Sequence, residues 1–209
     1  MATTVRSILN RVSALLNDEE RVRWPDAELL EWLNDGQRAV ARGPATDAYV
    51  LRDTITAVAG TVQNLPSNGI RLIDVVKDVT SGAAIHQSDY ATVDMLSSTW
   101  RNATEGAAEN YFYDERNPLQ FEVYPPQAGG EGIEVVYNAQ PGNALITGNI
   151  VISDMYADSL IDYIVYRAFS KDTEDASPEL GRATAFYRAF LIGVGYKDTA
   201  DAAIEPGRS

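Results

Sequence analysis

The spacing of hydrophobic residues changes twice along this chain of 209 residues, and that change limits the folds open to it. Residues 3–43 and 154–195 carry apolar side chains at positions i, i+3, i+4 and i+7, the spacing of an amphipathic helix. Residues 46–152 instead carry short alternating or continuous apolar runs between turn residues, which is typical of β-strands. This order predicts an α+β protein.

The N-terminal segment predicts two helices. Asn17-Asp18 interrupts the first helix, whose expected buried stripe consists of Val5, Ile8, Leu9, Val12, Leu15 and Leu16. Pro25 suits the first turn of the second helix, because a missing backbone N–H does no harm there. Gly43-Pro44 is expected to end that helix.

The C-terminal segment predicts two more helices. Asp154 is expected to cap a helix that continues to Lys171. Ser177 and Pro178 form a second start signal, as N-cap and first helical residue. The inner face of this last helix is expected to carry Leu180, Ala183, Tyr187, Phe190, Leu191 and Val194.

Four amphipathic helices cannot bury their apolar stripes alone, so they are expected to pack on one another. We therefore predict a four-helix bundle built from residues 1–45 and 153–196. A β-rich domain, residues 46–152, is inserted between the two helix pairs. Residues 197–209 are polar and rich in alanine, and we expect them to form a flexible C-terminal tail.

The β-rich segment predicts six strands and one short helix. TITAVAG and TVQNLPS read as a hairpin that closes near Ala59-Gly60, and IRLIDVVKDV and IEVVYNAQ as single strands. NYFYDE and LQFEVYPP are expected to pair across a turn at residues 116–118, with Phe121, Val123 and Leu119 on one face. A helix is expected at residues 90–97.

Two tryptophans flank the start of the second helix. On a helical wheel Leu29, Leu33, Gly36, Gln37 and Val40 share one face, while Glu28, Glu31, Asn34, Asp35 and Arg38 gather opposite. Trp32 lies at the border of the two faces, and Trp24 precedes the helix, where a bulky residue packs on the first turn. We predict that both rings belong to the core or its edge and do not form a ligand clamp.

The sequence offers no catalytic, cofactor-binding or metal-binding set of residues. There is no cysteine, which excludes disulfides and zinc–sulfur sites, and His86 is the single histidine. Phosphate-binding glycine loops and hydrolase motifs are missing as well. Asp154, Asp158 and Asp162 lie four residues apart, a spacing that fits a solvated or salt-bridged face better than a metal site. We expect a protein that is not an enzyme.

Charge and hydropathy restrict the partners. The net charge of −13 disfavours a protein that grips nucleic-acid phosphates, although it suits a conduit through which DNA passes. No apolar run is long enough to span a membrane, and no signal peptide is expected. The tyrosines Tyr111, Tyr113 and Tyr124 could line a sugar site, but ordinary cross-strand pairing is the favoured interpretation.

Three segments, taken in order, carry a resemblance to a known family. They are RWPDAELLEWLNDGQRAVARGP, FEVYPP and DYIVYRAFSKDTEDA. Together with the G-T-x-Q-x-L-P pattern at residues 60–66, the chain resembles the head-to-tail adaptor (connector) proteins of short-tailed bacteriophages, the group that includes tail tubular protein A. The resemblance covers about residues 5 to 195. Pro25 stands where members often have a Ser or Thr helix cap.

The resemblance implies a structural protein of the virion, at the head–tail junction, made in the cytoplasm of the host bacterium. Such proteins form a dodecameric ring with copies of themselves, between the portal protein and the tail nozzle protein. Tail fibres can dock on it, and DNA is a transient passenger of the genome-ejection channel. Two alternatives stay open: a tail-associated glycan-binding or hydrolytic module, and a head-completion protein of a long-tailed phage.

Two sets of residues are candidates for contacts in such a ring. Contacts between subunits are expected to involve Trp32, Asp158, Asp162, Arg167 and Lys171, although the charged residues among them could equally pair inside one subunit. A segment that grips the portal is expected at the C-terminus, with Tyr196, Ile204 and Pro206.

Overall fold

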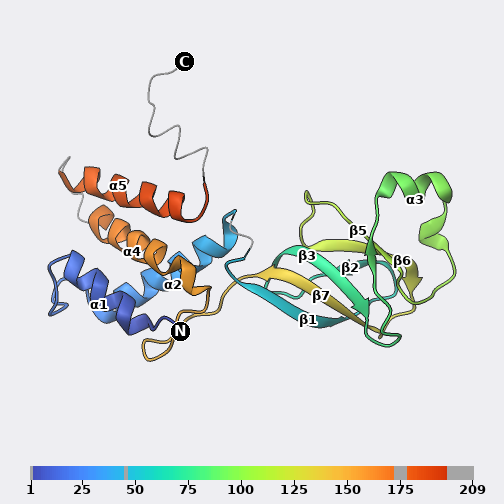
Figure 1. Cartoon of the computed structure of the whole chain (residues 1–209), viewed down its shortest axis with the longest axis horizontal. Coiled ribbons are helices and arrows are strands. Elements are labelled where there is room, and N and C mark those ends of the chain that lie inside the picture. Colours follow the sequence, from blue (N-terminus) through green and yellow to red (C-terminus); the bar gives the residue numbers. More distant parts are fainter. Residues whose placement is uncertain (1, 45–46, 172–177, 197–209) are drawn as a thin grey trace, which may run out of the picture. The chain divides into compact units, whose positions relative to one another are not determined.

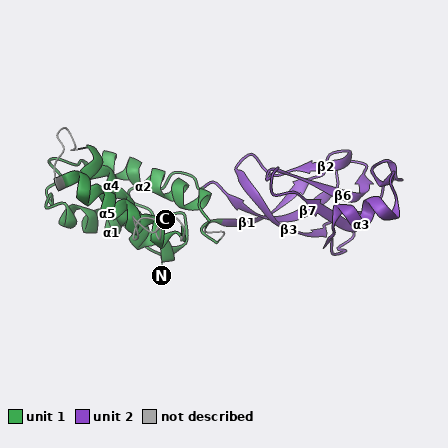
Figure 2. Ribbon diagram, turned by 90° about the horizontal axis from the view of Figure 1, so that it is seen from above, with its two compact units in different colours: residues 1–49, 141–209 green, residues 50–140 purple. Residues whose placement is uncertain are grey.

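The computed structural model describes residues 2–44, 47–171 and 178–196. The chain forms two compact units, one from residues 1–49 and 141–209 and the other from residues 50–140 (Figure 2). The first unit is helical and the second contains two β-sheets, so the predicted α+β class is confirmed. The β-sheet unit is shorter than the segment 46–152 expected from the sequence, because residues 141–152 belong to the helical unit.

The helical unit contains α1 (Val5–Leu15), α2 (Asp26–Arg42), α4 (Ala157–Lys171) and α5 (Pro178–Gly193). Helix α4 lies between α5 on one side and α1 and α2 on the other (Figure 1). Its buried residues face a core shared by all four helices, to which segment 144–152 adds Ala144, Ile150 and Ile152. Residues from both ends of the chain therefore form one core.

Helix α1 buries most of the predicted stripe. Val5, Ile8, Leu9 and Val12 are fully buried, and Thr4 caps the helix by accepting a hydrogen bond from the N–H of Ser7. The prediction is wrong for Leu15, which is 52% exposed. The reason is that α1 ends at this residue and the chain turns away through Asn17, whose φ is 52°.

Helix α2 starts one residue later than predicted. Pro25 is the N-cap and not a residue of the first turn; its carbonyl accepts hydrogen bonds from the N–H groups of Glu28 and Leu29. Gly43 ends the helix as predicted. Asn34, which the wheel places on the solvent face, is buried, and this prediction is therefore wrong.

The start of α4 also differs from the prediction. A short 3-10 helix, Asp154–Tyr156, precedes α4, so Asp154 does not cap it. The Asp154 carboxylate instead accepts a hydrogen bond of 2.7 Å from the N–H of Thr3. Helix α5 begins at Pro178 as predicted, while Ser177 lies outside the described residues.

The inner face of α5 is narrower than the sequence suggests. Ala183, Phe190 and Val194 are buried, whereas Leu180 and Tyr187 are exposed. Aromatic rings pack between the two helices, with the ring centre of Tyr187 4.7 Å from that of Tyr166 and the ring centre of Phe190 5.0 Å from that of Tyr163. The contact of α5 with the unit is thus made largely through α4.

The second unit contains two sheets, a short helix and a 3-10 turn. One sheet has the order β1 (Val50–Thr56), β7 (Gly132–Ala139), β3 (Gly69–Asp78). The other has the order β2 (Gly60–Asn64), β6 (Gln120–Gln127), β5 (Asn110–Tyr113), β4 (His86–Gln87). Helix α3 (Tyr90–Leu96) and the turn Trp100–Asn102 lie between β4 and β5 in the chain.

Pairing in the sheets confirms one predicted hairpin and overturns the other. Strands β5 and β6 are antiparallel neighbours, as predicted, and Tyr111 lies opposite Val123. Strands β1 and β2 do not pair, because β1 runs beside β7 in one sheet and β2 beside β6 in the other. The turn at Ala59-Gly60 therefore carries the chain between sheets, with Gly60 at φ 97°.

The core of this unit consists of alternate residues of its strands. Phe121 and Val123 of β6 are buried as predicted, but Leu119 lies before the strand and is exposed. On β7 the buried apolar positions also alternate, and they are Ile133, Val135, Tyr137 and Ala139. The pattern agrees with strands that each bury one face.

Candidate functional site

Two buried amides of α2 bind the chain where it returns from the β-sheet unit. Asn34 accepts a hydrogen bond of 2.7 Å from the N–H of Ala144, and its amide group donates to the carbonyl of the same residue. Gln37 is fully buried and accepts hydrogen bonds from the N–H groups of Val151 and Ile152, at 2.6 and 3.4 Å. Its own NH₂ group donates to Asn34. The two amides hold segment 144–152 against α2.

The neighbouring Arg38 extends this contact at the surface. Its guanidinium donates to Asn143 and to Asp35, both at 2.7 Å. Asp35 in turn lies 3.5 Å from the guanidinium of Arg167 on α4. The polar residues of the N-x-x-Q-R pattern in the adaptor-like motif thus bind the return segment, and Asp35 connects them to α4.

The two tryptophans lie in contact at the edge of the core. Trp24 is 5% exposed and Trp32 6%, and their ring centres are 5.4 Å apart. The ammonium of Lys171 lies 5.5 Å from the Trp24 ring and the guanidinium of Arg167 6.0 Å from the Trp32 ring. The prediction of core packing is confirmed, and the rings are covered by cations of α4.

Asp18 fixes the loop in front of Trp24. Its carboxylate accepts hydrogen bonds from the backbone N–H groups of Val22, Arg23 and Trp24. Burial acts to raise the pKa of Asp18, but these three donors and the charge of Arg23 outweigh it and lower the pKa. The loop geometry thus favours the ionised carboxylate.

Three of the charged candidates for subunit contacts form ion pairs inside the chain. Asp158 pairs with Arg11 at 2.8 Å, Lys171 with Glu28, and Arg167 with Asp35. All three pairs are substantially exposed, and such pairs contribute about 0 to 1 kcal/mol each. They join α4 to α1 and α2, whether or not a second copy also contacts them.

Asp162 differs from these residues. It is half-buried on α4, and within the described ranges no hydrogen bond or ion pair engages its carboxylate. Burial raises the pKa of Asp162, and the negative charge of Asp158 adds to the shift. Among the charged candidates, it is the carboxylate whose environment favours the neutral form.

Only one of the C-terminal candidates lies in the described residues. The N–H of Tyr196 donates to the carbonyl of Leu191, closing α5 together with Gly195, whose φ is 90°. The Tyr196 ring lies near Gly43 at the end of α2. Ile204 and Pro206 lie outside the described residues.

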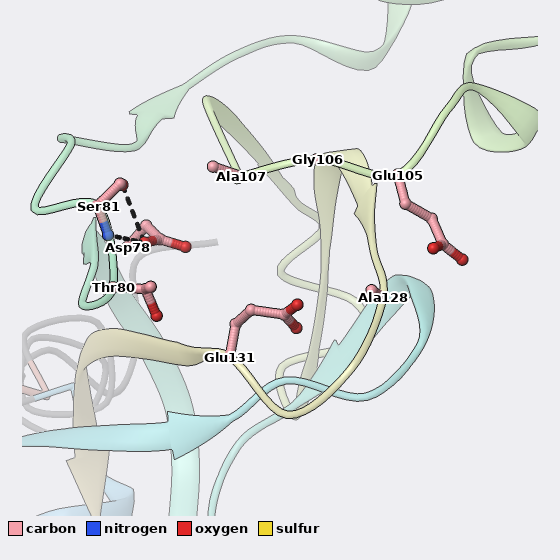
Figure 3. A pocket seen from close by; sticks show the side chains of 8 residues that line it. All are labelled: Asp78, Thr80, Ser81, Glu105, Gly106, Ala107, Ala128 and Glu131. Atoms are coloured by element: carbon pink, nitrogen blue, oxygen red, sulfur yellow. Dashed lines mark hydrogen bonds between the residues drawn. The ribbon is translucent and has the colours of Figure 1, made fainter.

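The β-sheet unit has a cavity of about 360 Å³, but no catalytic set of side chains lines it. Asp78 is buried and accepts hydrogen bonds from the N–H and hydroxyl of Ser81, at 2.6 and 2.9 Å. Figure 3 shows Glu131 reaching toward the cavity and Glu105 directed away from it. Its lining consists of Asp78, Thr80, Ser81, Glu105, Gly106, Ala107, Ala128 and Glu131.

Metal and histidine chemistry find no support in the described ranges. There, no three His, Cys, Asp or Glu side chains come together as a metal site would require. His86 is exposed on the short edge strand β4, and its backbone N–H donates to Glu109. Among the described residues, the His86 side chain has no hydrogen bond or ion pair.

Aromatic residues of the β-sheet unit pack in its core. Tyr111 is buried and its hydroxyl donates to Asp74, and burial raises the pKa of Tyr111 to about 12. Trp100 is buried against Phe112 beneath the guanidinium of Arg101, which lies 4.3 Å from its ring. The geometry favours the packing interpretation over a sugar site.

Comparison with known proteins identifies the family. Residues 3–209 match the family described as SU10 adaptor protein. A search of curated proteins finds no match. No helix among the described residues has the length and apolar character needed to cross a membrane. The chain belongs to the SU10 adaptor protein family, in agreement with the resemblance of its motifs to phage head-to-tail adaptors.

Proposed function

We propose that this protein forms a dodecameric ring that joins the portal to the tail nozzle of a phage and lines the genome-ejection channel. The observation that carries the proposal is the match to the adaptor family over residues 3–209. Membership implies a structural protein of the virion, and not an enzyme. Synthesis in the cytoplasm of the host bacterium follows from the same proposal.

The roles of the motif residues support a scaffold. Trp24 and Trp32 pack together, and Asn34 and Gln37 bind the return segment. Among the described residues, these side chains contact one another and the return segment; they stabilise a helical unit, which we interpret as the predicted four-helix bundle. The motif residues thus stabilise the fold and do not form a reaction site, which suits a protein that acts as a building block of an assembly.

The charge of the chain suits a channel through which DNA moves. With 30 acidic and 17 basic residues, the protein has few cations to form phosphate contacts, and such contacts would retard a passing genome. DNA is therefore proposed as a passenger. The stable partners are the portal protein, the nozzle protein and further copies of this chain, with tail fibres as a further partner.

The C-terminal residues are proposed to bind the portal. Tyr196 closes α5, and the chain continues for 13 residues, 197–209, which include Ile204 and Pro206. A variant truncated after Gly195 should keep the melting temperature of the full chain while losing binding to the portal. Portal binding by the truncated protein at full strength would contradict this assignment.

Electron microscopy tests the whole proposal. The purified full-length chain, mixed with the portal protein of the same phage, should give twelve-fold rings seated on the portal. The portal alone and the chain alone serve as controls. A chain that stays off the portal would contradict the proposed position.

A further inference from the structure

Helix α5 has an outer face that is exposed and nearly uncharged. Ala183, Phe190 and Val194 are buried toward the rest of the unit, and the residues on the opposite side are Gly181, Ala185, Arg188 and Ile192. Their spacing of four, three and four residues places them in one stripe along the helix. Thr184, Ala189 and Arg182, also exposed, flank it. In Figure 1, α5 lies at the margin of the helical unit, with α4 on its inner side.

Such a face is unusual for a helix in contact with solvent. A surface helix normally carries charged residues on its outer side, as α2 does with Glu31, Asp35 and Arg38. On α5 the central stripe holds a single charge, Arg188, and Ile192 is 54% exposed. Within the described ranges, Arg188 has no ion pair or hydrogen bond. This composition is typical of a helix that packs against α4 on its inner side and against a further partner on its outer side.

The loop that joins α1 to α2 has complementary properties. Leu15 and Val22 are exposed, Val22 by 83%, although both are large and apolar. Between them Glu19 and Glu20 are exposed, and among the described residues neither carboxylate has an ion pair. Apolar side chains and free acids thus lie together at this loop, while the α5 stripe offers apolar side chains and a free cation.

We propose that the outer face of α5, formed by Gly181, Ala185, Arg188 and Ile192, binds the α1–α2 loop of a second copy of this chain. The proposal rests on the proposed ring and specifies the contact between its subunits. Because the two surfaces differ, each copy can bind one neighbour on either side, which is the arrangement that closes into a ring. Pairing of two α5 helices is disfavoured by the Arg188 charges that would meet near the centre of the contact.

Cysteine cross-linking tests the contact directly, because the natural chain contains no cysteine. The full-length double variant Val22→Cys with Ala185→Cys, mildly oxidised at high protein concentration, should give a ladder of dimers, trimers and larger species on a non-reducing gel. Each single variant should give no ladder. The matched control is Val22→Cys with Ala27→Cys, since Ala27 is exposed on α2, away from the α5 stripe.

Charge reversal tests the pairing. Arg188→Glu should reduce the ladder several-fold, as should Glu19→Arg with Glu20→Arg, and combining all three changes should restore it. These positions are exposed, so the melting temperature should stay close to that of the parent. Reduction without restoration would overturn the assigned loop.

Three further outcomes overturn the proposal. Dimers from Ala185→Cys alone would show α5 pairing with α5. A ladder that appears only after deletion of residues 197–209 would show that the chain's own C-terminus covers α5. Portal-bound rings without any ladder would overturn the contact and leave the proposed function intact, whereas a ladder without portal-bound rings would overturn the proposed function alone.

Discussion

The side-chain oxygen of Gln37 accepts a hydrogen bond from the backbone N–H of Val151, which lies 114 residues further along the chain. The same oxygen receives the N–H of Ile152, and the amide nitrogen donates to Asn34. A single buried side chain thus satisfies main-chain groups that would otherwise lose their hydrogen bonds on burial.

Replacing this residue should therefore destabilise the helical unit. We expect Gln37→Leu to lower the free energy of unfolding by about 1 to 3 kcal/mol, because buried N–H groups are left without acceptors. Urea unfolding followed by circular dichroism measures the change. Glu31→Gln, an exposed change on the same helix, is the control and should stay within about 0.5 kcal/mol.

The close approach of α2 and α4 depends on Gly36. A Cβ atom at this position would lie 3.0 Å from Cδ1 of Tyr163 and 3.1 Å from Cδ2 of Leu160. Gly36→Ala should cost about 1 to 3 kcal/mol through overpacking. Gly181→Ala is the matched control: its Cβ would meet nothing within 4 Å, so the isolated chain should gain about 0.5 to 1 kcal/mol from helix propensity. Equal effects on thermal unfolding would contradict this account.

Trp32 was also a candidate for contacts between subunits, and its burial makes a clear prediction. Trp32→Ala should lower the stability of the isolated chain by about 3 to 5 kcal/mol, because it leaves a cavity beside Trp24. Differential scanning calorimetry provides the measurement, with the exposed Val22→Ala as control. A normal melting temperature combined with loss of ring assembly would assign Trp32 to the interface instead.

Asp162 should give the stability of the protein a recognisable pH dependence. Its pKa in the folded chain is raised above the ordinary value of 3.8, so ionisation disfavours the folded state. Below that value both states are protonated and the residue contributes nothing; the penalty develops as the pH rises through 3.8 and is complete above the folded pKa. Asp162→Asn should therefore be more stable than the natural chain at pH 7, and this gain should vanish in acid.

The comparison variant for this effect is Glu31→Gln, since Glu31 is exposed on α2. At pH 7 its stability should stay within about 0.5 kcal/mol of that of the natural chain. If Asp162→Asn behaved in the same way, the carboxylate would have to be paired in solution. Urea unfolding at a series of pH values distinguishes these results.

The buried face of a helix could be predicted from the sequence where its apolar residues are the ones that become buried. Val5, Ile8, Leu9 and Val12 repeat at helical spacing and are buried because nothing competes with that pattern. Asn34 was misplaced because a wheel sorts residues by polarity alone. Its burial is possible only because Ala144, 110 residues away, offers both an N–H and a carbonyl to it.

The strands were predictable, but their partners were not. Ala59-Gly60 looks like the turn of a local hairpin, yet β1 finds its neighbour in β7 and β2 in β6. Alternation shows which face of a strand is buried and carries no information about the strand beside it. The long-range pairing of β7 with both β1 and β3 is therefore a tertiary property.

The candidate site residues show the same limit. Spacing placed Asp158 and Asp162 on one side of α4, but it did not reveal that Arg11, 147 residues earlier, pairs with Asp158 while Asp162 has no described partner. The structural role of Asn34 and Gln37 was missed, although their separation of three residues on one helix was a usable signal. On α5, Tyr187 and Leu180 were assigned to the inner face, but both are exposed.

The discontinuous helical unit sets an order for folding during synthesis. When the ribosome has made residues 1–140, the β-sheet unit is complete, whereas α1 and α2 still lack α4 and the segment that Gln37 binds. The apolar stripes of α1 and α2 therefore stay exposed until residues 141–171 leave the ribosome. The inserted unit is thus the part of this protein that can reach its final structure first, although its residues begin only after those of α1 and α2.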